Sequence, residues 1–98
     1  NYIGFINALE ILSKYQGTKM IITPGIVEGG IMQAEINRNI ASEICKKCDF
    51  CYLVNNKNTE YFEEEFQKNN FNNYHSLTIH RMHILTITKK YPLYIRCD

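Results

Sequence analysis

The sequence predicts an α/β domain with a mostly parallel sheet, and two observations carry that prediction. Amphipathic segments alternate with short apolar, β-branched segments along the first two thirds of the chain, which is the pattern of parallel strands joined by helical crossovers. The run from Phe50 to Val54 is nearly all apolar, as expected for a strand buried on both faces. The 98 residues are expected to form a single domain, 1–98.

Local patterning defines the elements of the first half. Apolar residues at spacings of three and four predict a helix over about residues 4–15, which Gly17 ends. An apolar run over residues 19–23 predicts a strand, and Pro24-Gly25 ends it with a turn. Apolar residues stepping by four then predict a helix over about residues 32–47, with charged residues on its opposite face.

The second half is less regular. After the strand at residues 50–54, Thr59 is expected to cap a helix that ends at the polar break 69–73. Residues 77–87 fit either a strand or a helix, and their β-branched content favours a strand. A final strand is predicted over Leu93–Ile95.

Composition narrows the class of protein. A net charge of +1 favours neither nucleic acid nor an anionic membrane as partner, and no apolar run is long enough to cross a bilayer. The four cysteines are not needed as disulfide staples in so aliphatic a chain, so we expect a reduced, cytoplasmic setting. The chain starts at Asn1 without methionine and stops at Asp98 directly after a strand pattern, which predicts a fragment of a longer protein.

The cysteine spacing Cys45-x-x-Cys48-x-x-Cys51, with Cys97 far away, allows two interpretations. Iron–sulfur and zinc sites use such spacings. However, Cys45 and Cys48 fall on the apolar face of one helix and Cys51 falls in a buried strand. Because free cysteine packs as a small hydrophobe, core packing is the favoured interpretation, and a metal or redox site stays the alternative.

Other candidate groups give little support for catalysis. The histidines His75, His80 and His83 could hold zinc, but no carboxylate lies among them, so surface positions are favoured. A solvated helix face is the interpretation of the glutamates Glu60, Glu63, Glu64 and Glu65. Neither a phosphate-binding glycine loop nor a nucleophile–base pair is recognisable. The sequence therefore predicts no catalytic residue and no metal ligand.

The segment from Thr23 to Gly30 is the candidate site. An apolar strand ends there and a helix follows after a glycine-flanked loop that carries one carboxylate, Glu28. Ligands of open α/β sheets bind at such carboxyl ends of strands. Glu28 either caps the following helix or helps to shape a substrate pocket.

Several segments in consistent order resemble the C-terminal domain of Mur ligases. They cover most of the chain up to about residue 66 and are residues 1–12, 19–30, 33–37, 48–54 and 58–59. The closest likeness is to the ligases that add D-alanyl-D-alanine to the UDP-N-acetylmuramoyl tripeptide of peptidoglycan. The most specific part is the Thr23-Pro24-Gly25 segment with Glu28 and Gly30.

This resemblance implies a Rossmann-like, three-layer domain that is the third domain of an ATP-dependent amide ligase. In that family ATP and magnesium are bound mainly by the central domain, outside this chain, and a carboxylate activated as an acyl phosphate is attacked by an amine. The C-terminal domain closes over the site and holds the incoming amino component. The implied partners are the N-terminal and central domains, a UDP-linked muramoyl peptide and an amino acid or dipeptide. The fragment alone is expected to be inactive.

The resemblance also implies roles for individual residues. Asn1 corresponds to a position near the nucleotide. Gly25, Glu28 and Gly30 correspond to the loop that faces the amino substrate, and Asn37 to a polar position on the following helix.

Two positions depart from the family pattern. Gly29 stands where leucine is usual and Tyr2 where proline is usual. The alternative interpretation of the chain is a Rossmann-like binding or interaction module without catalytic activity.

Overall fold

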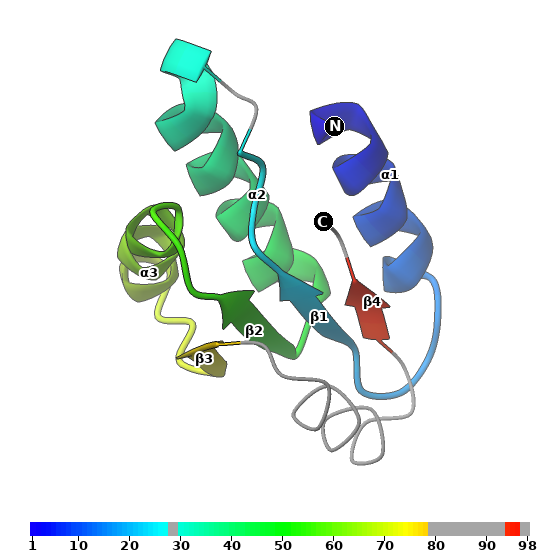
Figure 1. Ribbon diagram of the computed structural model, residues 1–98. Coiled ribbons are helices and arrows are strands. Elements are labelled where there is room, and N and C mark those ends of the chain that lie inside the picture. Colours follow the sequence, from blue (N-terminus) through cyan, green and yellow to red (C-terminus); the bar gives the residue numbers. More distant parts are fainter. Residues whose placement is uncertain (28–29, 79–93, 97–98) are drawn as a thin grey trace.

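The computed structural model describes residues 1–27, 30–78 and 94–96 (Figure 1). Its elements in chain order are α1 (Tyr2–Ser13), β1 (Met20–Thr23), the short 3-10 helix η1 (Gly30–Met32), α2 (Gln33–Lys47), β2 (Phe50–Val54), α3 (Thr59–Lys68), β3 (Tyr74–Leu77) and β4 (Tyr94–Arg96). None of the described helices is long and apolar enough to span a membrane.

The described strands form one parallel sheet. Its order is β3-β2-β1-β4, and each neighbouring pair runs parallel. Ile21 of β1 lies opposite Cys51 of β2 on one side and Ile95 of β4 on the other. The predicted α/β fold with a parallel sheet is therefore confirmed. Strands β2 and β3 follow β1 on one side of it, whereas β4, the last described strand, lies on its other side. The direction in which successive strands are added to the sheet therefore reverses between β1 and β4.

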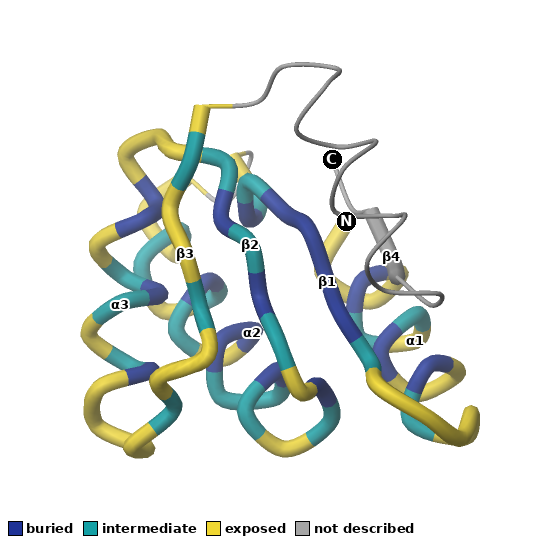
Figure 2. The backbone as a smooth tube through the Cα atoms, turned by 90° about the horizontal axis from the view of Figure 1, so that it is seen from below, coloured by how far each residue is buried: buried dark blue, intermediate teal, exposed yellow. Residues whose placement is uncertain are grey.

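The described helices all lie on one face of the sheet, with α2 between α1 and α3 (Figure 2). The described residues thus make two layers, and a helical layer on the opposite face is not among them. This arrangement corrects the expectation that β2 is buried on both faces. Cys51 and Leu53 point to the helices and are buried, whereas Phe50, Tyr52 and Val54 alternate with them and are only half-buried.

The core fills the space between the sheet and the helices. Phe62 and Phe66 of α3 are fully buried and meet edge to face, with ring centroids 5.9 Å apart. The other elements contribute aliphatic side chains to the same cluster, namely Leu9, Leu12, Ile21, Ile40, Ile44 and Leu53. Each such side chain stabilises the fold by roughly 1.5–3 kcal/mol through burial.

The starts of two helices differ from prediction, and a side-chain cap explains the first of them. Helix α1 begins at Tyr2, earlier than predicted, because the Asn1 Oδ1 atom accepts a hydrogen bond from the backbone N–H of Gly4 at 2.7 Å. The expected cap at Thr59 is wrong. Asn58 is the N-cap residue of α3, and the Thr59 Oγ1 atom instead accepts from the N–H of Asn56 at 3.0 Å.

Most of the ambiguous segment 77–87 cannot be compared with the structure, because residues 79–87 lie outside the described residues. Its first residue, Leu77, ends strand β3, and Thr78 is not in a strand. β4 overlaps the predicted strand Leu93–Ile95, whose first residue also lies outside the described residues.

Helix α3 ends in a left-handed turn at Asn70, whose φ is 56°. The N–H of Phe71 then donates to the carbonyl of Phe66 at 2.8 Å, and the two rings pack with centroids 4.9 Å apart. This bond and its hydrophobic contact are the features of a Schellman-type helix end. They turn the chain from α3 into β3.

We expect Asn70→Ala to lower the free energy of unfolding by about 1 kcal/mol, because alanine pays the full cost of the left-handed conformation. Urea denaturation measures the effect, and Asn72→Ala in the exposed segment after the turn is the control. Equal stability of the two variants would contradict the assigned role of Asn70.

Candidate functional site

The chain leaves β1 beside the reversal of strand order. β1 has β2 on one side and β4 on the other, and residues 24–27 follow its carboxyl end on the way to η1. We call these residues the β1–α2 loop. Ligands of open α/β sheets bind at the carboxyl ends of strands where the order reverses, so the structure places the predicted loop where a ligand site is expected.

Asn37 of α2 holds the β1–α2 loop from inside. Its side chain is fully buried. The Asn37 Nδ2 atom donates to the carbonyls of Ile26 at 2.9 Å and Gln33 at 2.8 Å, and Oδ1 accepts from the N–H of Ile26 at 2.8 Å. With both amide hydrogens used and no exposed surface, Asn37 contributes to a site by fixing the loop rather than by offering its own polar atoms.

A second loop also holds the β1–α2 loop in place, and the sequence analysis did not identify it as part of the candidate site. Residues 55–58, here the β2–α3 loop, follow the strand that neighbours β1. The Asn58 Nδ2 atom donates to the carbonyls of Pro24 at 3.2 Å and Ile26 at 3.3 Å, and Asn56 Nδ2 donates to Pro24 at 2.9 Å. Gln33 Nε2 in turn donates to Asn58 Oδ1 at 2.6 Å.

We call Gln33, Asn37, Asn56 and Asn58 the amide clamp. The signal that could have revealed its second half was present in the sequence. An asparagine-rich segment follows a strand predicted to run parallel to β1, and the carboxyl ends of parallel strands meet at one edge.

Only glycine fits at position 25, because Asn37 and Phe62 lie close to its backbone. Gly25 is buried, with a φ of 77°, and its N–H donates to Thr23 Oγ1 at 2.9 Å. A Cβ atom at this position would lie 2.5 Å from Asn37 Oδ1 and 2.7 Å from the ring of Phe62. Gly25 therefore allows the loop to pack directly on the clamp and on the core.

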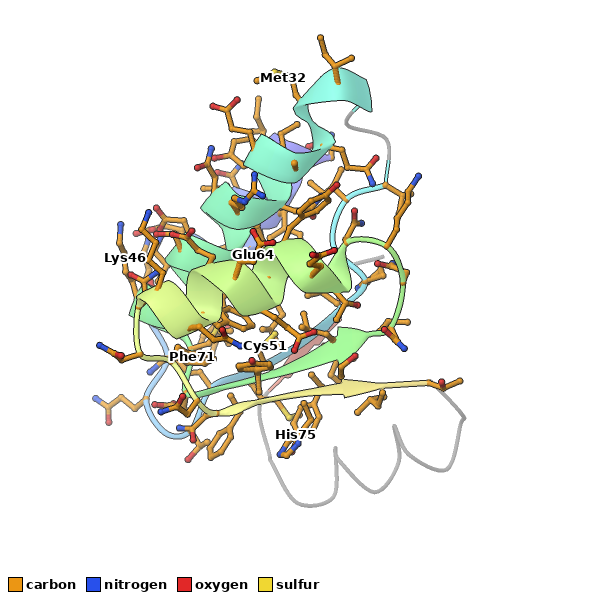
Figure 3. The ribbon with its side chains drawn as sticks, turned by 90° about the vertical axis from the view of Figure 1, so that its left-hand side faces the viewer. Met32, Lys46, Cys51, Glu64, Phe71 and His75 are labelled. Carbon is orange, nitrogen blue, oxygen red and sulfur yellow. The ribbon has the colours of Figure 1, made fainter. Side chains whose placement is uncertain are left out.

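Gly30 is exposed and opens η1 with a φ of 57°, and a Cβ there would meet open space. Around it, Val27, Ile31 and Met32 expose apolar side chains, Ile31 completely. Figure 3 shows Met32 at the end of α2 that is remote from Lys46. The predicted site residue Glu28 and its neighbour Gly29 lie outside the described residues.

Asn1 lies at the start of α1, at the same end of the molecule as the β1–α2 loop (Figure 1). Its side chain caps the helix. The residues of this first turn line an open depression, namely Asn1, Tyr2, Ile3, Gly4 and Asn7. None of these side chains is basic, and no group of three potential metal ligands lies together among the described residues. These residues do not fit a site for ATP and magnesium of their own.

The described cysteines pack in or against the core, as favoured. Cys48 and Cys51 are buried and Cys45 is half-buried. Burial, and secondarily Glu65, raises the pKa of Cys45 to about 11. Burial, with smaller contributions from Cys48 and Cys45, raises the pKa of Cys51 well above its usual range. Such thiols stay protonated and are poor nucleophiles and ligands. Cys97 lies outside the described residues.

The remaining polar candidates that the structure describes are exposed or partly exposed. His75 is exposed on β3 and stacks on the ring of Tyr52, with centroids 5.7 Å apart (Figure 3), while His80 and His83 lie outside the described residues. Along α3, Glu60 and Glu64 are exposed and Glu63 and Glu65 partly so. Glu64 pairs with Arg38 of α2 at 3.0 Å. The glutamate face of α3 that was predicted to be solvated therefore also supplies an ion pair that links α3 to α2.

Comparisons of this chain with protein-family models, with curated proteins and with solved structures find no match. A functional assignment must rest on the geometry at the carboxyl edge of the sheet and on the pattern of residues in the sequence.

Gly25→Ala is expected to lower the free energy of unfolding by about 2–5 kcal/mol, because a left-handed backbone and an overpacked contact both add cost. Gly30→Ala is the matched control, since it shares the positive φ but meets open space, and we expect a loss of only about 1–2 kcal/mol. Urea denaturation of both variants measures the difference. Equal losses would show that the contact with Asn37 and Phe62 is not restrictive.

Alkylation should report the raised pKa of Cys45. At pH 8 a pKa of about 11 in place of 9.0 lowers the thiolate fraction about 100-fold, so iodoacetamide should modify native Cys45 at least that much more slowly than the unfolded chain. Peptide mapping by mass spectrometry separates Cys45 from the other cysteines. Similar rates in the native and the unfolded chain would contradict the burial assigned to this thiol.

Proposed function

We propose that this chain is the amino-substrate-binding domain, of the Mur ligase type, of an ATP-dependent amide ligase of peptidoglycan precursor synthesis. The observation that carries the proposal is the β1–α2 loop, which the amide clamp fixes at the carboxyl edge of the sheet beside the reversal of strand order. Its backbone is set before any ligand arrives, and such preorganisation lowers the cost of binding.

The residues that carry the family resemblance support the proposal. Asn37 and Asn58 belong to two separate stretches of that resemblance, and their side chains converge on the loop that contains Gly25, which belongs to a third. Gln33, in the same stretch as Asn37, donates to Asn58. A chance likeness spread along the sequence gives no reason for the matching residues to meet at one edge. Their convergence is expected if the resemblance reflects a shared site.

The contribution of this domain would be positional. Holding an amine in line with its reaction partner is a recognised source of rate enhancement, and closure of a domain excludes water from the reacting groups. Exposed apolar side chains at Val27, the last residue of the loop, and at Ile31 and Met32 after it suit contact with a surface that closes over the loop. The bonds would be made and broken by groups outside this chain.

A binding module without catalytic function is the second candidate. It rests on the same observation, because a loop that the amide clamp holds in place suits binding whether or not a reaction follows. The two candidates differ in what the rest of the protein must contain. The ligase proposal requires a phosphate-binding Gly-x-x-x-x-Gly-Lys-Ser/Thr segment in another domain.

We expect D-alanyl-D-alanine to shift the amide resonances of Val27, Gly30 and Ile31 when the ¹⁵N-labelled chain is titrated with and without ATP. The same titration with L-alanyl-L-alanine is the control, because it presents the same groups in the mirror configuration. Shifts confined to the D,D-dipeptide would support the ligase domain. Absence of shifts at the loop under both conditions would refute it and leave the binding module.

A further inference from the structure

Asn58 occupies the junction of three elements. It belongs to the β2–α3 loop and is fully buried. Its two amide hydrogens point to the carbonyls of Pro24 and Ile26, in the β1–α2 loop, and its oxygen accepts from Gln33, the first residue of α2. The side chain therefore reaches both loops at the carboxyl edge and the helix between β1 and β2.

Neighbouring contacts fix the orientation of Asn58. Its own N–H donates to Asn56 Oδ1 at 2.7 Å, and Asn56 Nδ2 donates to the same Pro24 carbonyl that Asn58 approaches. The carbonyls of Pro24 and Ile26 can only accept, so they select the rotamer in which the Nδ2 atom of Asn58 faces the β1–α2 loop. The amide oxygen of Asn58 then faces α2, where Gln33 Nε2 donates to it.

We infer that Asn58 is a positioning residue that locks the β1–α2 loop to the β2–α3 loop, so that the two loops meet a ligand as one rigid edge. The locking itself needs no ligand. Its consequence for binding rests on the proposed function of the β1–α2 loop. A neutral side chain with two donors and one acceptor is suited to this role, because each of its polar atoms is matched.

Asn58→Asp is the sharpest variant. The two side chains have nearly the same shape, and one carboxylate oxygen can still accept from Gln33. The other replaces the donor that faced the carbonyls of Pro24 and Ile26 with an acceptor. Asn69→Asp is the matched control, because it replaces the same amide with the same carboxylate at the exposed end of α3. There the Nδ2 atom of Asn69 donates to the carbonyl of Glu65.

Hydrogen exchange tests the lock without any ligand. In Asn58→Asp we expect the amides of Gly25 and Ile26 to exchange about 10-fold faster relative to the β2 amide of Cys51, since the loop loses its buried hydrogen bonds. A rise in the ratio to Cys51 reports opening of the loop beyond any change in global stability. The ratio should stay unchanged in Asn69→Asp. An unchanged ratio in Asn58→Asp would overturn the inference.

A milder variant covers the case in which Asn58→Asp does not fold. Gln33→Met removes the donor to Asn58 Oδ1, at a half-buried position that a flexible methionine can fill. We expect the exchange ratio to change in the same direction but less. No change in Gln33→Met, with Asn58→Asp unfolded, would also overturn the inference.

Titration with D-alanyl-D-alanine separates the inference from the proposed function. If the unmodified chain binds the dipeptide, Asn58→Asp should weaken binding about 10-fold through loss of preorganisation, and equal affinity would overturn the positioning role. If the unmodified chain does not bind, the proposed function fails, while the exchange ratio still decides whether Asn58 locks the loops.

Discussion

A turn that is partly removed from water needs hydrogen-bond partners for its own backbone, and side-chain amides supply them here. Gly25 is buried, and Pro24 and Ile26 on either side of it are half-buried. Asn37 and Asn58 bond to this backbone from two different elements. The exit of β1, the position of α2 and the start of α3 are therefore fixed by one set of contacts.

The same contacts join the site to the core. Phe62 packs on Phe66 in the interior and also lies where a side chain at position 25 would stand. The β1–α2 loop therefore packs directly on both the amide clamp and the aromatic core, with no room for a side chain at position 25. Changes to the interior of α3 should alter the loop, and a change of loop conformation should disturb α3. In this fold the stability of the domain and the geometry of its candidate site are not separate properties.

The spacing of apolar residues was sufficient to predict the elements whose side chains face the core. It could not predict the start of a helix that one capping side chain decides, nor the side chains that meet from distant parts of the sequence. The predicted range of β2 matches the structure, and that of α2 is within one residue, because apolar residues recur there at strand and helix spacing. The start of α1 was missed because one side chain, Asn1, decides it. Asn58 was missed because its partners lie 32 and 34 residues away, a separation at which local sequence carries no signal except strand order.

The clamp consists of amides, and this has a consequence for the proposed function. An amine must lose its proton before it can attack a carbonyl carbon, so the charge beside the loop would change during the reaction. Charged clamp residues would respond to that change by altering their own protonation or pairing. Gln33, Asn37, Asn56 and Asn58 do not titrate near neutral pH, so the loop backbone they hold keeps one shape whether the amine is charged or neutral. A neutral clamp thus separates the positioning of the ligand from its protonation.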